Sequence, residues 1–263
     1  MVHPLTKKLV APSITLLCAG AIALLQFSKL AQVTRQANQT QSKAEYLQAA
    51  AQEKTSLAFM EQLPNFGFDN LVADWTFLRF LQYFGDGKAR QQTGYLLSPE
   101  YFEIIVDRDP LFLKPYLFLS TSTSLYAGKA ERTVALMNRG LQFLSPQINP
   151  DAYFVWIYKA TDELLFLGNT QAAKRSHEQA FQWAKANDNP ESQRIAAITA
   201  RTVQFLARNP DSKQAQVNAW LMVLSNAVDD KTRQNAINNI KRLGGQVAFT
   251  PDGTIRVQQP KQD

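Results

Sequence analysis

The sequence predicts an all-α fold: a solenoid of helical hairpins, with an N-terminal transmembrane or stalk helix and a small C-terminal β-hairpin. Leucine, alanine and glutamine are common, and glycine is modest at 11 of 263 residues, as in helical proteins. Apolar residues recur at helical spacing in successive segments that end at glycine or proline. These segments return with a period of about 34 to 40 residues, which is typical of a solenoid.

The N-terminal segment, residues 1–27, is predicted to be a transmembrane anchor or a signal. Residues 9–27 carry no charge and follow Lys7 and Lys8. An apolar stretch of about 19 residues is close to the length that spans a bilayer, so we expect an uncleaved anchor. A cleaved signal peptide is the alternative, because residues 19–21 resemble a small-residue cleavage site. A buried core helix is the third interpretation.

Residues 28–63 are predicted to form a helical stalk. Small apolar side chains, from Leu30 to Ala51, recur every three or four positions on an otherwise polar segment. Such a thin stripe buries little apolar area. We therefore expect a solvated spacer, with a weak coiled coil as the alternative.

Residues 64–244 form the predicted helical-repeat domain. Its first helix, at 69–84, is apolar nearly all round, which is typical of a helix that is buried or lies at an interface. A second helix opens at Ser98-Pro99, with proline at its first position. Three helix pairs and a single helix are expected after it, at 111–127 with 130–144, 151–167 with 170–187, 191–207 with 212–228, and 231–243.

Residues 245–263 are predicted to be a β-hairpin and a tail. Alternating apolar residues flank the turn sequence at 250–253, Thr-Pro-Asp-Gly, which indicates a hairpin. Two strands alone are marginally stable, so we expect the hairpin to pack on the last helices.

Two of the helix pairs share small residues and turns in one register. Residues 167–190 read LGNTQAAKRSHEQAFQWAKANDNP, with a turn at Gly168 and small residues at Ala173 and Ala180. The earlier pair places Gly128 at the turn and Thr133 and Gly140 at the small positions. Over residues 69–228 the chain resembles the tetratricopeptide-repeat family.

The resemblance implies a right-handed superhelix whose concave groove is lined by the first helix of each pair. Repeats of this family bind peptides or partner proteins and share no catalytic residues. With its N-terminal anchor, the chain looks like the membrane-bound tetratricopeptide proteins of bacteria, some of which assist the assembly of membrane complexes.

The candidate partner-binding residues fall into an aromatic and a basic group. Aromatic side chains crowd the helix at 69–84, and basic residues fall on later helices. Three arginines spaced by seven share one helix face, where they can hold an acidic peptide or lipid headgroups, or simply face solvent. The candidates are Trp75, Phe77, Phe80, Tyr83, Lys114, Lys159, Arg194, Arg201 and Arg208.

The sequence predicts no enzyme, no cofactor, no metal site and no nucleic-acid partner. Its one cysteine, Cys18, and two histidines, His3 and His177, lack the spacing of a metal site or a catalytic triad. The net charge of +6 comes without a run of basic residues. We expect Asp74 to lie at an exposed edge, and the adjacent pair at 162–163, Asp and Glu, to be solvated.

These observations together predict a membrane-anchored scaffold that binds a protein partner, with assistance in assembling a membrane complex as one use. The partner is expected to be membrane-associated. A permanent structural subunit of a membrane complex is the alternative, favoured by the surplus of aromatic residues between positions 66 and 118. An enzyme is a remote third class, because no set of convergent polar groups is evident.

The bulk of the chain is expected on the extracytoplasmic side, periplasmic or lumenal. Lys7, Lys8 and the terminal amine flank one end of the apolar stretch, against Lys29 and Arg35 at the other, which weakly favours a cytoplasmic N-terminus. Protease added to sealed vesicles with the native sidedness should therefore leave residues 28–263 intact. Digestion from the cytoplasmic face would reverse the orientation.

Overall fold

The computed structural model describes residues 20–22, 42–64, 67–209, 213–225, 227, 230–249 and 255–260. The predicted anchor at 9–27 lies outside them, apart from a helical turn at 20–22. No helix in the described ranges is both long enough and apolar enough to span a bilayer. The described residues from 50 onward belong to one compact unit, and the chain before residue 50 is assigned to a separate unit. The described part of the predicted stalk is mostly helix α2, Lys43–Glu61.

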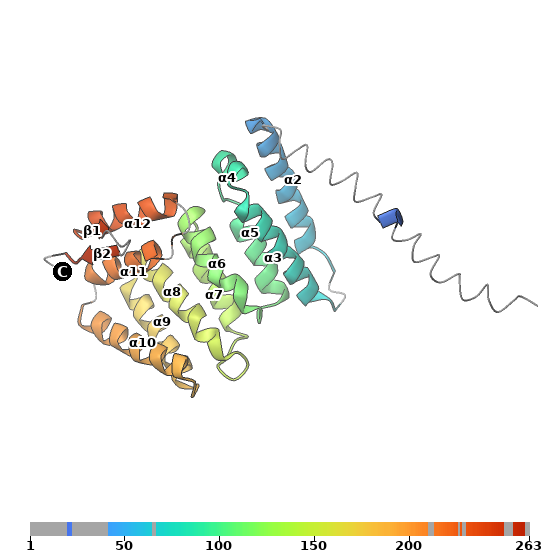
Figure 1. The fold of residues 1–263 in the computed structure, drawn as a ribbon. Coiled ribbons are helices and arrows are strands. Elements are labelled where there is room, and N and C mark those ends of the chain that lie inside the picture. The colour runs from blue at the N-terminus through green and yellow to red at the C-terminus, as the bar shows by residue number, and fades with distance from the viewer. Residues whose placement is uncertain are drawn as a thin grey trace, which may run out of the picture. The chain divides into compact units, whose positions relative to one another are not determined.

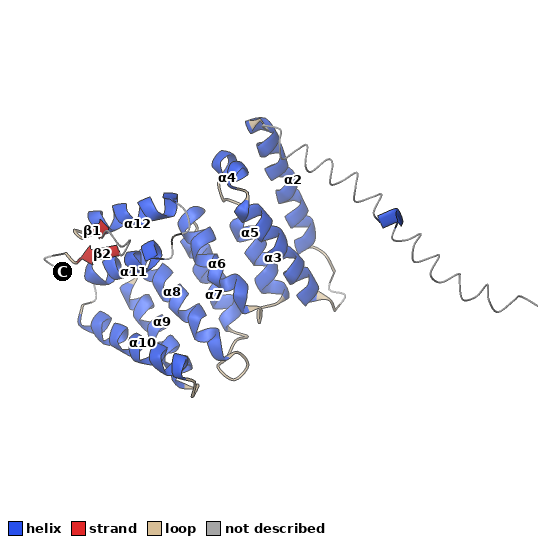
Figure 2. Ribbon diagram, in the orientation of Figure 1, coloured by secondary structure: helices blue, strands red, loops and turns tan. Residues whose placement is uncertain are grey.

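The described part of the chain is mainly helical, as predicted (Figures 1 and 2). The first helices of the repeat region are α3 (Asp69–Gly85), α4 (Gly87–Thr93), α5 (Ser98–Arg108) and α6 (Leu113–Leu119), followed by the π-helix η1 (Ser120–Tyr126). Next come α7 (Ala130–Leu141), the 3₁₀ turn η2 (Pro150–Ala152), α8 (Tyr153–Leu165), α9 (Thr170–Lys185) and α10 (Pro190–Arg208). The last elements are α11 (Lys213–Ser225), α12 (Asp230–Arg242), β1 (Gln246–Phe249) and β2 (Ile255–Gln258).

The predicted C-terminal hairpin is confirmed. Strands β1 and β2 pair antiparallel, with Val247 opposite Val257. Val247, Ile255 and Val257 pack against a cluster that contains Trp220 and Ile240, from α11 and α12. The hairpin thus rests on the last two helices, as its small size requires.

Successive helices pack side by side within residues 50–263. Helix α5 packs against α3 and α7, α8 packs against α7 and α9, and α9 packs against α10. Figure 1 shows this succession from α7 to α10. The π-helix η1 packs against α7, so the expected pairs at 111–127 with 130–144 and at 151–167 with 170–187 are observed. In the first pair the leading helix is divided into α6 and η1.

The expected pairing of the helices at 191–207 and 212–228 is wrong. Helix α10 packs mainly against α9, whereas α11 packs mainly against α12 and α8. The two preceding pairs reverse direction at glycines with positive φ. The sequence after α10, Asn209-Pro210-Asp211, has no glycine at which such a left-handed turn would form.

The turns after η1 and after α8 have the same hydrogen-bonded geometry, 40 residues apart. Gly128 and Gly168 have φ of 66° and 62°, which glycine adopts at little steric cost. In both turns the amide after the glycine donates to a carbonyl six residues earlier, Lys129 to Thr123 at 2.9 Å and Asn169 to Glu163 at 2.8 Å. The periodicity seen in the sequence thus extends to the backbone.

The aromatic core lies between α3 and its neighbours. Phe80 is fully buried and contacts the rings of Tyr101, Phe102 and Phe118. Phe77 and Tyr83 lie on the same buried face of α3. Three of the four aromatic candidates for partner binding are therefore core residues. The helix at 69–84 is apolar on nearly all sides, but only one of its faces is buried.

The small residue Gly140 on α7 makes room for the ring of Tyr116 on α6. A Cβ built on Gly140 would lie 1.8 Å from the hydroxyl oxygen of Tyr116. Tyr116 is almost fully buried, and its hydroxyl donates to the carbonyl of Pro110 at 3.0 Å. The ring therefore has little room to withdraw.

Replacing Gly140 with alanine should lower the free energy of unfolding by about 1–3 kcal/mol, because the added methyl overpacks the site. Gly85→Ala is the matched control, since a Cβ there meets no atom within 4 Å; it should be neutral or slightly stabilising. Urea unfolding of both variants measures the difference. Equal stability of the two would show that the α6–α7 contact does not depend on glycine.

Candidate functional site

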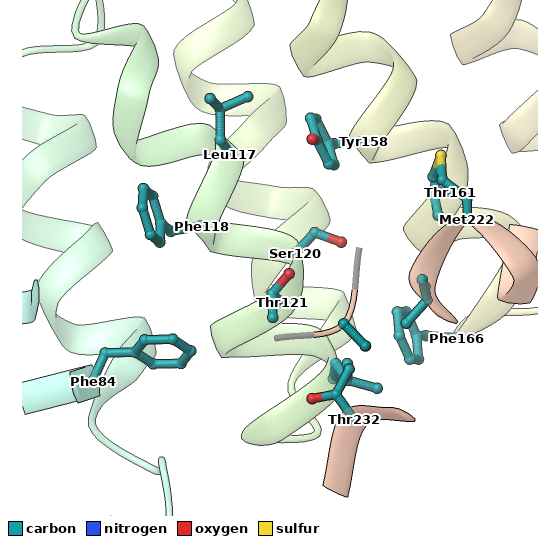
Figure 3. A pocket seen from close by; sticks show the side chains of 13 residues that line it. Phe84, Leu117, Phe118, Ser120, Thr121, Tyr158, Thr161, Phe166, Met222 and Thr232 are labelled. Atoms are coloured by element: carbon teal, nitrogen blue, oxygen red, sulfur yellow. The ribbon is translucent and has the colours of Figure 1, made fainter. Parts of the chain in front are cut away.

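A pocket of about 280 Å³ lies where α6, η1, α8, α11 and the start of α12 meet (Figure 3). Apolar walls come from Phe84 at the end of α3, from Leu117 and Phe118 on α6, and from Phe166 and Met222. Hydroxyl-bearing residues also line the pocket: Ser120, Thr121, Tyr158, Thr161 and Thr232. None of the described lining residues is charged.

The π-helix η1 forms one wall of this pocket. It begins with the run STSTS at 120–124. The Ser122 hydroxyl donates to the carbonyl of Phe118 at 2.8 Å, and the amide of Ala127 donates to Ser122 five residues back. Serine and threonine compete for helix carbonyls in this way, and π-helical turns are frequent at functional sites. The sequence analysis did not predict η1, although the serine and threonine run is a sequence signal from which it could have been suspected.

Asp162 lies behind the Ser120 wall. The Ser120 hydroxyl donates to its Oδ1 at 2.6 Å, and the carboxyl group is fully buried. Its Oδ2 has no hydrogen-bond partner among the described residues. Burial raises the pKa of Asp162 to about 7; the hydrogen bond from Ser120 opposes the rise, and the charge of Glu163 adds to it.

Glu163 belongs to a second buried polar cluster, on another side of α8. Lys159 Nζ lies 2.6 Å from Glu163 Oε1 and donates to Ser176 Oγ at 2.8 Å. The Ser176 hydroxyl donates in turn to Glu163 Oε2 at 2.6 Å. The candidate Lys159 is thus buried and neutralised within the fold.

The expectation that Asp162 and Glu163 are solvated is wrong. Adjacent residues on a helix do point in different directions, but α8 is covered on both of these sides. The π-helix η1 meets Asp162, and α9 meets Glu163 through Ser176. Because α8 lies between neighbours, both directions lead into the protein interior.

The remaining basic candidates are exposed. Lys114 lies on α6, and the three arginines lie on α10. Arg194 pairs with Glu191 at 3.2 Å, while Arg201 and Arg208 make no ion pair with any described residue. The arginine side chains at 201 and 208 are therefore exposed without an ion pair among the described residues. This arrangement is compatible with an acidic partner and with a solvated helix face.

The outer face of α3 carries the fourth aromatic candidate. Leu71, Trp75 and Leu78 are 63%, 58% and 53% exposed. Their spacing of four and three residues places them on one face of the helix, which we call the α3 stripe. Asp74 is exposed beside it, as expected. Its neighbour Arg79 pairs instead with Glu53 of α2, at 2.6 Å.

His177 is the one histidine in the described ranges. Its Nδ1 is buried without a hydrogen-bond partner among them, and burial lowers its pKa to about 4. The described residues contain no group of three histidine, cysteine, aspartate or glutamate side chains placed to hold a metal ion.

Comparison with protein-family models, with curated proteins and with solved structures found no match to this chain.

The two perturbed groups give opposite pH dependences of stability. Folded Asp162 stays protonated up to pH 7, whereas an unfolded aspartate ionises near pH 4, so Asp162 destabilises the fold as pH rises between these values. Folded His177 stays neutral down to about pH 4, whereas an unfolded histidine is protonated below pH 6.5. His177 therefore destabilises the fold as pH falls across nearly the same window.

Asp162→Asn should gain stability relative to the wild type as pH rises from 4 to 7, by on the order of 4 kcal/mol at most. The sign follows because asparagine cannot ionise. His177→Met should show the opposite slope relative to the wild type; Met137 is buried at the position 40 residues earlier. Urea unfolding from pH 4 to 7.5 measures both. An Asp162→Asn profile parallel to the wild type would contradict the assignment.

Proposed function

We propose that this chain is a membrane-anchored, tetratricopeptide-like scaffold that binds a protein partner through the α3 stripe. The exposure of Leu71, Trp75 and Leu78 is the observation that carries the proposal. Contiguous exposed apolar side chains mark interaction surfaces. Tryptophan is enriched among the residues that dominate binding energy.

The repeat architecture is supported by the recurring turn geometry. Gly128 and Gly168 occupy the same place in two hydrogen-bonded turns, and the small residues Gly140 and Ala180 follow each turn at the same interval. A helical hairpin cannot bury its apolar face alone, so hairpins stack on their neighbours into a solenoid. In such a solenoid the first helices, here α6 and α8, line the concave groove.

The predicted anchor at 9–27 restricts the class of partner. Tethering to a bilayer raises the effective concentration of the scaffold toward proteins of the same membrane. A membrane-associated protein, bound during assembly of its complex, is therefore the partner that we propose. The predicted orientation places this activity on the extracytoplasmic side.

A permanent structural subunit is the second candidate, and the same stripe is its support. The aromatic surplus between positions 66 and 118 packs largely inside, around Phe80 and Phe102. The exposed apolar surface is therefore smaller than the sequence alone suggests, which favours a reversible partner. Full-length protein that stays monomeric in nanodiscs without a partner would support the scaffold, and aggregation would favour the permanent subunit.

The double variant Trp75→Ser, Leu78→Ser should lose the partner. Removing a central tryptophan and a neighbouring leucine typically costs at least 2 kcal/mol of binding energy, or about a 30-fold loss of affinity. The measurement is quantitative crosslinking in intact native membranes, with the adduct identified by mass spectrometry. Ile198→Ser on α10 is the matched control, because Ile198 is also a half-exposed apolar residue.

The proposal requires one defined adduct that the stripe variant loses and the Ile198 variant keeps. An adduct that persists in the stripe variant, or that both variants lose alike, would contradict it.

A further inference from the structure

The pocket beside η1 has the composition of a small-molecule site. Small-molecule sites are concave and mostly apolar, with a few convergent polar groups. Phe84, Phe118, Phe166 and Met222 supply apolar walls from four separate segments of the chain. The volume of about 280 Å³ is near the lower end of the range for such sites. It suits a ligand of one or two rings.

Two hydroxyl groups in this pocket are available to a ligand. Tyr158 on α8 and Thr121 on η1 both line it, and neither hydroxyl makes a hydrogen bond with a described residue (Figure 3). By contrast, the hydroxyl of Ser120 is engaged by Asp162 and that of Thr161 by the carbonyl of Ile157, at 2.6 and 3.0 Å. A polar group in a mainly apolar site is costly until a hydrogen bond satisfies it.

The uncharged lining of the pocket argues against an ionic ligand. No described lining residue is charged, so a buried ion would lack a counter-charge. Asp162 lies directly behind the Ser120 wall, where its ionised form repels an anion. Burial also raises the pKa of Tyr158, which keeps its hydroxyl as a donor at neutral pH. A ligand carbonyl or ether oxygen is the natural acceptor.

The π-helix η1 leaves the Thr121 side chain more exposed than those of its neighbours. Thr121 is partly exposed, whereas its neighbours Ser120, Ser122 and Thr123 are buried. Thr121 lies in the π-helical turn and lines the pocket. This backbone feature is independent of the pocket volume, and it marks functional sites in other helices.

We propose that the pocket between η1 and α8 binds a neutral, mainly apolar small molecule that accepts a hydrogen bond from Tyr158 through a carbonyl oxygen. Thr121 supplies the second polar contact from the facing wall. This site is separate from the α3 stripe and does not depend on the proposed function.

Benzophenone is the probe that tests this proposal, because it is neutral, has two rings and a carbonyl, and forms covalent adducts on irradiation. The full chain is held in nanodiscs, and labelled peptides are mapped by mass spectrometry. Saturable labelling on residues 117–125, 158–166 or Met222 is expected. Labelling spread over the lipid-exposed and surface residues without saturation would overturn the proposal.

Matched compounds and variants test the chemistry. Diphenylmethane, which lacks the carbonyl, should compete roughly tenfold less well than benzophenone, as expected for one lost hydrogen bond. The anion 4-benzoylbenzoate should not compete. Tyr158→Phe should weaken saturable labelling by a similar factor, while Tyr46→Phe on α2 should not. Equal competition by all three compounds, or unchanged labelling of Tyr158→Phe, would overturn it.

Two further variants separate this proposal from the proposed function. The Trp75→Ser, Leu78→Ser variant should label normally, because the stripe lies on the outer face of α3. Tyr158→Phe should keep the crosslinked partner. A result in which the stripe variant also loses pocket labelling would contradict the separation of the two sites.

Discussion

The burial of three ionisable residues on α8 constrains the middle of this fold. Lys159, Asp162 and Glu163 occupy a helix that α7, α9, α11 and η1 all contact. A buried charge without a partner costs several kcal/mol, so the elements that face these side chains must present polar groups to them. Ser176 does so from α9, and Ser120 does so from η1. The register of both elements against α8 follows from these contacts.

The same constraint shapes the pocket. Ser120 can reach Asp162 only if η1 lies close to α8 at its N-terminal end. The next residue of η1, Thr121, lines the cavity together with Tyr158 of α8. Closing that space would require large apolar side chains on η1, but η1 begins with five serine and threonine residues. The hydroxyl-rich sequence that gives Asp162 its hydrogen bond from Ser120 therefore also leaves the pocket open.

Features that depend on neighbouring residues were predictable from the sequence. Gly128 and Gly168 mark helix ends because a left-handed backbone favours glycine whatever the surroundings. The C-terminal hairpin followed from the turn residues and the alternation beside them. The pairing of consecutive helices was predictable in the same way as far as α10, after which the sequence has no glycine at the turn.

Features that depend on distant residues were not predictable. The partners of Asp162 and Glu163 come from 42 residues before and 13 residues after them, so the pair looked like a solvated edge. The expected helix at 111–127 was treated as one element, although the serine and threonine run at 120–124 interrupts its apolar residues where η1 forms. Segments from Phe84 to Thr232 line the pocket, and no local pattern brings them together. The α3 stripe was predicted only in part. Trp75 was a candidate, but the sequence did not distinguish this exposed residue from the buried Phe77 and Phe80.

The rigidity of α3 explains how its outer face can serve as a binding surface. Phe80 holds the inner face in the aromatic core, and two arginine pairs fix the helix along its length: Arg79 with Glu53, and Arg108 with Asp69. Trp75 therefore projects from a backbone that binding does not need to order. Because immobilising a flexible segment consumes part of the binding energy, a preorganised tryptophan contributes more of its apolar area to affinity than the same residue on a loop. The exposure of Leu71 and Leu78 on either side extends that fixed surface along two turns of the helix.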